Sequence, residues 1–397
     1  MILSNSETPS ANQLQTKRLI AIDMLRGLVM VLMVLDHTRD FFTNVRFRAT
    51  DLTQTNIPLF LTRWVTHLCA PTFIFLAGVA AYLYFVRRPQ TKQELSRYLI
   101  IRGLWLVFLE LTVVRFAWLF DPTYSFSMAG VLWAIGWSMV VLAALIYLPI
   151  PVISAVGILL IGGHNLFDNI HAEQLGRWGW LWAVLHEPKM LAPFPNKIFY
   201  IGYPLIPWIG VMATGYAFGN VFTKDKITRQ RLLRLFGLGL IAGFVVLRAL
   251  NVYGDPQPWS VQTKFSYTIL SFINCYKYPP SLLYLLITLG LAMLLLYLFE
   301  KQRWSIFKPL ILFGQVPLFF YIVHLWLNHI TAILLALPKY GLKAIILPFL
   351  NSRLMPKDYG YDLPMIYNLW IIIIIMLYPL CNWFMNYKTK HRKKLVV

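Results

Sequence analysis

Residues 18–37 read Arg18-Leu-Ile-Ala-Ile-Asp23-Met-Leu-Arg26-Gly27-Leu-Val-Met-Val-Leu-Met-Val-Leu-Asp36-His37. The stretch has the length of one membrane-spanning helix, which needs about 20 mostly apolar residues. Its ionisable side chains are costly at bilayer depth unless they are paired or hydrated. On a helix that turns about 100° per residue, Arg26, Met30, Met33 and His37 fall at about 300°, 340°, 280° and 320° from Asp23. One stripe of the predicted helix therefore carries a carboxylate, a guanidinium and an imidazole, and it is our first candidate for a functional site.

The composition predicts a membrane protein. Of the 397 residues, 58% are hydrophobic and 13% are charged, whereas a soluble domain has about 25% charged residues. Lys and Arg number 36 against 16 Asp and Glu, for a formal net charge of +20. In a soluble protein this charge would suggest nucleic acid, but the positive-inside rule explains it better in a membrane protein. We therefore expect the lipid bilayer as a partner, and no nucleic acid.

The expected fold class is all-α, a polytopic transmembrane bundle of about 10–11 spans, because barrel-type alternation is absent. The predicted spans are 19–38, 60–86, 98–120, 127–147, 149–163, 199–221, 232–250, 280–299, 309–336 and 366–387. Residues 340–351 form a further apolar segment, suited to an interfacial or re-entrant helix. We expect a flexible polar tail at 1–16, a single domain at 17–388 and a basic cytoplasmic tail at 389–397. The first span lacks a small-x-small cleavage site, so we interpret it as a retained span.

The basic residues predict how the spans are oriented. With the N-terminus inside, the shorter inner loops and tails carry most of the Lys and Arg residues, and the longer outer loops are more sparsely basic. This pattern is typical of a protein with both termini in the cytoplasm. We therefore expect a multi-pass protein of the inner (plasma) membrane, with Asp23 and Arg26 toward the cytoplasm and His37 at the outer end of the first span.

The cysteines and the outer loops carry weaker signals. Cys69, Cys275 and Cys381 are far apart and odd in number, so they predict neither a disulfide framework nor a metal site. We expect no metal. Residues 164–198 mix His, Asp and Asn with aromatic residues, and residues 251–279 mix Asn, Asp and Lys with them. Such mixtures suit contacts with carbohydrate or lipid headgroups. An aromatic belt at the membrane interface is the ordinary explanation for any single Trp in them.

The residues of the first span suit acyl transfer. A neutral imidazole at His37 can take a proton from an attacking hydroxyl or amine, and Asp36 or Asp40 could orient the ring or stabilise its cation. Asp23 and Arg26, three residues apart, can pair with each other, and Arg26 could meet an anionic donor such as a coenzyme A phosphate. The structural alternative is a buried ion pair with a terminal His in the headgroup region.

Six stretches of the chain carry a family resemblance. They are Arg18-x4-Asp23-x-x-Arg26-Gly27 with His37, Trp64-Val-Thr-His67-Leu-Cys-Ala-Pro71-Thr-Phe-Ile-Phe-Leu-Ala-Gly78, Gly163-His164-Asn165-Leu-Phe-Asp168, Tyr203-Pro-Leu-Ile-Pro207-Trp208-Ile-Gly210, Lys277-Tyr278-Pro279-Pro280-Ser281 and Phe313-Gly314-Gln315-Val-Pro317-Leu-Phe-Phe-Tyr321-x-x-His324. Together they resemble the bacterial branch of the heparan-alpha-glucosaminide N-acetyltransferase catalytic-domain family, within the transmembrane acyltransferases. The resemblance extends from residue 18 to about 330.

This resemblance implies an enzyme that moves an acetyl group from cytoplasmic acetyl-CoA to an amine or hydroxyl of a sugar or glycan on the outer side of the membrane. The lysosomal member of the family has its catalytic His in the loop after the first span, whereas this chain has no His between His37 and His67. The wider transmembrane acyltransferases place their essential His at the position of His37. His37 is therefore the first candidate and His67 the second, with Asp36 assisting. Asp23 and Arg26 are expected to bind the acyl-CoA.

Further residues are candidates for binding the acceptor. They are Arg39, Asp40, His164, Asn165, Tyr278 and His324. Each has an ordinary alternative, such as a polar helix terminus for Arg39 and Asp40 or a packed bundle histidine for His324. Glu110 and Arg115 do not share a helix face, so each needs a partner from another helix, and a structural ion pair is the expected role.

Two other classes of protein remain open. A secondary transporter of an anionic or sugar-derived solute would also have intramembrane charges and proline-interrupted helices, but the chain lacks the paired repeats expected of one. A non-enzymatic membrane scaffold would leave the outer His and Asp residues unexplained. A homodimer is compatible with the sequence.

Overall fold

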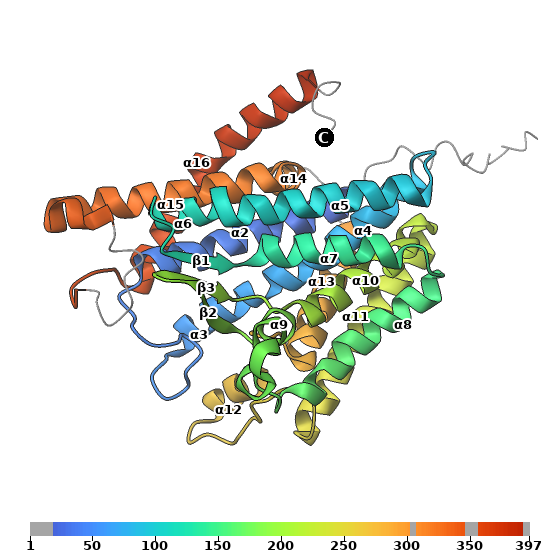
Figure 1. The fold of residues 1–397 in the computed structure, drawn as a ribbon, viewed down its shortest axis with the longest axis horizontal. Coiled ribbons are helices and arrows are strands. Elements are labelled where there is room, and N and C mark those ends of the chain that lie inside the picture. The colour runs from blue at the N-terminus through green and yellow to red at the C-terminus, as the bar shows by residue number, and fades with distance from the viewer. Residues whose placement is uncertain (1–18, 302–306, 346–355, 392–397) are drawn as a thin grey trace, which may run out of the picture.

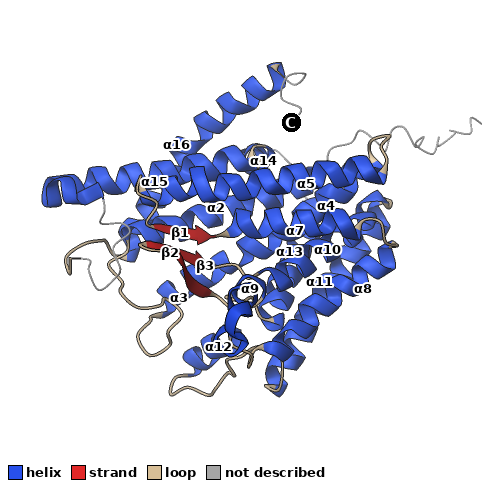
Figure 2. Ribbon diagram, in the orientation of Figure 1, coloured by secondary structure: helices blue, strands red, loops and turns tan. Residues whose placement is uncertain are grey.

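The computed structural model describes residues 19–301, 307–345 and 356–391. The predicted tail at 1–16 lies outside these residues, as do 346–351 of the apolar segment and 392–397 of the predicted C-terminal tail. Helices make up most of the described chain (Figure 1; Figure 2), which confirms the all-α class. Seven helical segments of this part are long and apolar enough to cross a membrane, so the chain is a multi-pass membrane protein.

The ten predicted spans correspond to helical segments. These are α2 (Ile20–Phe42), α3 (Ile57–Val65) with η1 (Thr66–Leu68) and α4 (Cys69–Val86), α5 (Lys92–Leu109) with the π-helical turn η2 (Glu110–Val114) and α6 (Arg115–Leu119), α7 (Val131–Leu145), α8 (Ile150–Gly163), α10 (Leu205–Phe218), α11 (Lys226–Leu250), α13 (Leu282–Lys301), α14 (Lys308–Gln315) with α15 (Pro317–Tyr340), and α16 (Leu363–Lys390). The 23 residues of α2 have a length of about 35 Å at 1.5 Å per residue, which is enough to cross the hydrocarbon core.

The prediction of one continuous helix over 309–336 is wrong. α14 ends at Gln315 and α15 begins at Pro317, and Val316 between them has φ −127° and ψ 48°. A proline has no backbone N–H to donate, and its ring clashes with the carbonyl four residues earlier in a helix. The break lets α14 and α15 pack separately against α2.

A small sheet, absent from the prediction, consists of β1 (Phe126–Ala129), β2 (Lys189–Phe194) and β3 (Lys197–Ile201) in the order β1-β3-β2. β1 is parallel to β3 and β2 is antiparallel to it. The tight β2–β3 turn contains Asn196 with φ 59°, a left-handed conformation that Asn tolerates. The spans predicted at 127–147 and 199–221 therefore begin too early, because their first residues are strands.

α2 lies at the centre of the bundle. α4, α13, α14, α15 and α16 all pack against it. Large exposed apolar side chains lie on peripheral helices, including Leu159 of α8, Val246 of α11 and Ile375 of α16. The strands lie with α9 (Gly179–Leu185) and α12 (Phe265–Ile273) on one side of the bundle (Figure 2), whereas one end of α16 projects away from it (Figure 1).

Two glycines bring α2 and α14 into backbone contact. A Cβ atom on Gly27 would lie 1.9 Å from the Leu310 carbonyl oxygen, and one on Gly314 would lie 1.9 Å from the Asp23 carbonyl oxygen. Small residues permit such close helix crossings in membranes. Any side chain at either position must therefore push the two helices apart.

We expect Gly314→Ala to lower the free energy of unfolding by ~1–3 kcal/mol, the usual cost of overpacking. The matched control is Gly239→Ala on α11, where a Cβ atom meets nothing within 4 Å. Thermal unfolding of the purified variants in one detergent measures the difference. Equal unfolding temperatures for the two variants would contradict the close crossing.

Candidate functional site

Asp23 and Arg26, near the N-terminal end of α2, form the ion pair that their spacing predicts. Arg26 Nη1 lies 3.4 Å from Asp23 Oδ1 and donates to the Gly314 carbonyl at 3.1 Å. The Asp23 side chain is buried and the Arg26 side chain is 20% exposed. Pairing offsets part of the cost of burying the charges, and the close crossing of α2 and α14 supplies the second acceptor.

Asp36, toward the other end of α2, is held by two arginines. Arg63 of α3 donates to both of its carboxylate oxygens, and Arg39 Nη2 lies 3.0 Å from Oδ1. Arg39 also donates to Asp40 at 2.5 Å. Among the contacts described for these residues, neither carboxylate bonds to His37, although we expected one of them to orient the ring. Asp36 instead forms a charge cluster beside it.

His37 is paired with a second histidine, His324 of α15. His37 Nδ1 lies 2.7 Å from His324 Nε2, and His324 Nδ1 lies 3.1 Å from the Phe320 carbonyl oxygen. Since a carbonyl only accepts, Nδ1 of His324 must carry the hydrogen, and Nε2 of the neutral ring accepts. His37 therefore donates from Nδ1, and its own Nε2 keeps a lone pair. The arrangement selects the tautomer that a general base needs.

Aromatic side chains and a second polar contact fix the position of His37. Its ring lies edge-on to Trp118 of α6 with a centroid separation of 4.8 Å, and to Tyr321 of α15 at 6.4 Å. The neighbouring Thr38 donates to Asn328 of α15 at 2.9 Å. α2 and α15 are thus joined by two adjacent polar contacts, and the imidazole has little freedom to turn.

Three cavities adjoin one another along α2. The inner cavity, of about 320 Å³, is lined by the stripe residues Arg26, Met30 and Met33. The central cavity, of about 370 Å³, contains His37 and shares Val131 and Tyr321 with the inner one. The stripe predicted from helical periodicity therefore lines two cavities in series.

The third, outer cavity has a volume of about 670 Å³. It shares five residues with the central cavity, namely Asp40, Arg63, Tyr200, Lys277 and Tyr278. Arg39, Arg46 and Arg48 also line it, so its wall is strongly cationic. The three cavities therefore follow one another along α2, with His37 in the central one.

Lys277 and Tyr278 lie where the central and outer cavities meet. Burial opposes ionisation of the Tyr278 phenol, but the neighbouring Lys277 and Arg63 charges outweigh it and lower the pKa of Tyr278. The ring of Tyr203 lies edge-on to that of Tyr278, with centroids 5.4 Å apart. Tyr278 is therefore a strong hydrogen-bond donor at the mouth of the central cavity.

Three predicted site residues lie away from His37. His67 belongs to η1 and lines the outer cavity, and its backbone carbonyl accepts from Tyr284 at 2.7 Å. His164 and Asn165 lie in η3 (His164–Phe167), and Asn165 lines a fourth cavity. No hydrogen bond between His37 and His67 is found among the described residues. Of the predicted site residues, the structure therefore brings Asp36, Asp40 and Tyr278 together with His37 in the central cavity and bonds His324 to His37.

Sequence reasoning missed several residues that surround His37. Tyr321 and Lys277 occur in the stretches quoted above, so the signal was present but was not assigned to a site. Arg63 and Trp118 lie outside those stretches, so nothing in the sequence pointed to them. Glu110 and Arg115 also line the central cavity. Glu110 has a partner from another helix, because it accepts from the Leu132 N–H at the start of α7. Arg115 instead pairs with Asp121, which follows α6 directly.

The chain matches one family model. The family described as "Heparan-alpha-glucosaminide N-acetyltransferase, catalytic" matches residues 18–256, more than half of the chain. No curated protein sequence matches closely enough to be recognised as a relative. The matched range includes His37, His67 and the charge cluster around Asp36, but ends before His324. The chain therefore belongs to the heparan-alpha-glucosaminide N-acetyltransferase catalytic-domain family of membrane acyltransferases.

Proposed function

We propose that the protein transfers an acyl group, most simply acetyl, from acyl-CoA in the inner cavity to a sugar hydroxyl or amine in the outer cavity. The observation that carries this proposal is the series of cavities along α2, with His37 in the central one. Both substrates reach the same imidazole from opposite ends of the helix. The family membership supports an enzyme rather than the transporter weighed above.

The inner cavity suits the acyl-CoA arm. Arg26 and the exposed Arg102 lie in its wall and are suited to phosphate oxygens. Between them and His37 the wall is apolar, with Met30, Met33 and Ala77. The rise from Arg26 to His37 is about 17 Å at 1.5 Å per residue, comparable to an extended pantetheine arm. The thioester would then lie beside His37.

His37 acts as the general base in this proposal. Its Nε2 takes the proton from the acceptor as the acceptor oxygen or nitrogen bonds to the thioester carbonyl carbon. The carbon–sulfur bond then breaks, and the departing sulfur recovers the proton from His37. Tyr278 lies in the same cavity and would donate a hydrogen bond to the carbonyl oxygen as it gains negative charge. An acyl group carried on His37 Nε2 would use the same lone pair.

The outer cavity suits a polar acceptor. Tyr200, Tyr276, Arg46 and Arg48 are among the residues that line it. Aromatic faces and hydrogen-bond donors together are appropriate for sugar rings and hydroxyls, and the excess of cations favours an acceptor that bears negative charge. The charge distribution of the loops supports an orientation with this end outside and both termini in the cytoplasm, in an inner (plasma) membrane.

His37→Ala should lower coenzyme A release by ~10²–10⁴-fold, the usual contribution of a general base, while acyl-CoA still binds. A thiol-release assay with acetyl-CoA and a panel of free and lipid-linked amino sugars measures this. The control is His391→Ala, since His391 ends α16 and bonds only to the Tyr387 carbonyl in the contacts described for it. Unchanged turnover in a folded His37→Ala protein would exclude the role.

Ala77→Phe should fill the inner cavity and weaken acetyl-CoA binding by at least about tenfold, because a ring replaces a methyl group in its wall. The control is Ala242→Phe on the exposed face of α11, which adds the same volume where no helix is packed. Titration of each variant with acetyl-CoA gives the affinity directly. Equal affinities would show that the donor does not use this cavity.

A further inference from the structure

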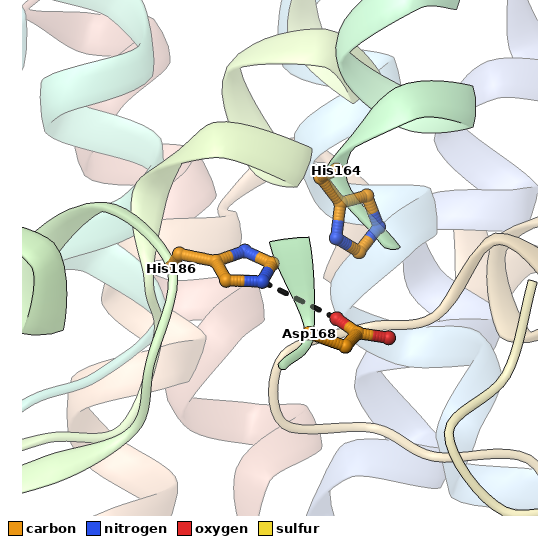
Figure 3. A group of neighbouring side chains, drawn as sticks. All are labelled: His164, Asp168 and His186. Atoms are coloured by element: carbon orange, nitrogen blue, oxygen red, sulfur yellow. Dashed lines mark ion pairs between the residues drawn. The ribbon is translucent and has the colours of Figure 1, made fainter. Parts of the chain in front are cut away.

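Two histidines and an aspartate converge beside the outer loops, away from His37 (Figure 3). His164 follows α8, Asp168 ends η3, and His186 ends α9. The chain returns from Asp168 to His186 through η4 (Ala172–Trp178) and α9. Trp182 of α9 donates to the Ile170 carbonyl at 2.8 Å, which holds the returning segment against the first.

The spacing of the three side chains suits a metal ion. One nitrogen of each histidine and one carboxylate oxygen of Asp168 all lie within 4.8 Å of one another. His186 Nε2 lies 3.2 Å from Asp168 Oδ1. Ligand atoms of a tetrahedral Zn²⁺ site lie about 3.3 Å apart, given bonds of about 2.0–2.1 Å. One edge of the site therefore already has this length, and small side-chain rotations would shorten the others.

Ring nitrogens of His164 and His186 that lack hydrogen-bond partners are the second observation that favours a metal site. His164 and His186 are 1% and 3% exposed. Both ring nitrogens of His164 and Nδ1 of His186 have no hydrogen-bond partner among the described residues, and the Pro280 carbonyl beside His164 lies outside normal hydrogen-bond geometry. A buried polar group that loses its water and gains no partner destabilises the folded state. Coordination would give His164 the partner that the protein does not supply.

The surroundings orient Asp168 and leave the site accessible. Asn165 Nδ2 donates to Asp168 Oδ2 at 2.9 Å, and Asn165 Oδ1 accepts from the Leu282 N–H of α13 at 2.9 Å. This outer-shell contact fixes the carboxylate with Oδ1 toward His186, as is usual in metal sites. A fourth cavity of about 340 Å³ reaches Asp168 and His186. It provides an access path and room for a water ligand.

We propose that His164, Asp168 and His186 bind a divalent transition-metal ion of the Zn²⁺ type, with water in the fourth position. Two imidazoles and one carboxylate suit Zn²⁺, whereas Ca²⁺ and Mg²⁺ prefer oxygen ligands throughout. The proposal replaces the expectation of no metal, which rested on the cysteines. The two histidines lie on different elements, so their spacing in the sequence gave no motif.

The site adjoins the outer cavity. Pro188, Gln257 and Tyr276 line both the outer cavity and the fourth cavity that leads to Asp168. A bound ion would join the segment 164–186 to the start of α13 through Asn165, and so stabilise one wall of the outer cavity. The site does not rest on the proposed acyl transfer.

Metal content tests the proposal directly. Full-length protein, purified without a histidine tag, is stripped with a chelator, loaded with Zn²⁺ and measured by mass spectrometry for bound metal. We expect one Zn²⁺ per chain, unaffected by Ca²⁺ or Mg²⁺. Stripped protein loaded with Co²⁺ in place of Zn²⁺ should show the visible absorption of a tetrahedral nitrogen–oxygen site. No stoichiometric Zn²⁺, or a Co²⁺ spectrum of an octahedral all-oxygen site, would overturn the proposal.

Substitutions of the proposed ligands and of Asn165 test where the ion binds. His186→Ala and Asp168→Asn should lose stoichiometric Zn²⁺, and Asn165→Ala should weaken its binding by about 10–100-fold, the usual effect of an outer-shell change. The control is His171→Ala in the same segment, whose side chain is 55% exposed and pairs with Glu187. It should bind Zn²⁺ as the wild type does. Equal metal content in the wild type, Asp168→Asn and His186→Ala would contradict the assignment. If these variants do not fold, the Co²⁺ spectrum of the wild type still decides.

Discussion

The need to pair the charges of α2 inside the bundle is the constraint on which the neighbouring helices depend. An ion left alone in a low-dielectric interior costs several kcal/mol, so each group on the stripe requires a partner at contact distance. Arg26 reaches the Gly314 carbonyl because two glycines let α14 touch α2. Farther along, Arg63 brings α3 to Asp36. The charged residues of α2, on the stripe and at Asp36, therefore determine where α3 and α14 can lie.

The stripe was predictable from the sequence and its partners were not. Helical periodicity is a local property, so the positions of Arg26, Met33 and His37 on one face follow from their spacing alone. The contacts of His37 with His324 and of Arg26 with Gly314 join residues 287 and 288 positions apart. Nothing local specifies such pairs, because they depend on which helices cross and at what depth. For this reason Asp36, adjacent in sequence, was the expected partner of His37, whereas His324 is the observed one.

The small sheet of β1, β2 and β3 was harder to predict for a different reason. Short apolar runs suit a strand as well as the first turn of a helix, and residues 126–129 and 197–201 are such runs. They pair because the chain brings them side by side after a long connection, and in that register Met128 lies opposite Tyr200. Both side chains line the central cavity. The sheet is therefore part of the candidate site, although composition alone predicts only helices.

The polarity of the cavity walls changes at His37. On the inner side the wall is mainly apolar, with Met30, Met33 and Ala77, and on the outer side it carries several guanidinium groups. In the proposed reaction His37 must keep its lone pair, yet it lies next in sequence to the carboxylate of Asp36. Arg63 and Arg39 pair with that carboxylate, so its lone pairs are directed to the two guanidinium groups rather than to the ring. The arginines that stabilise the buried carboxylate of Asp36 therefore also keep that carboxylate from bonding to His37. The imidazole can then act in the reaction proposed for the central cavity.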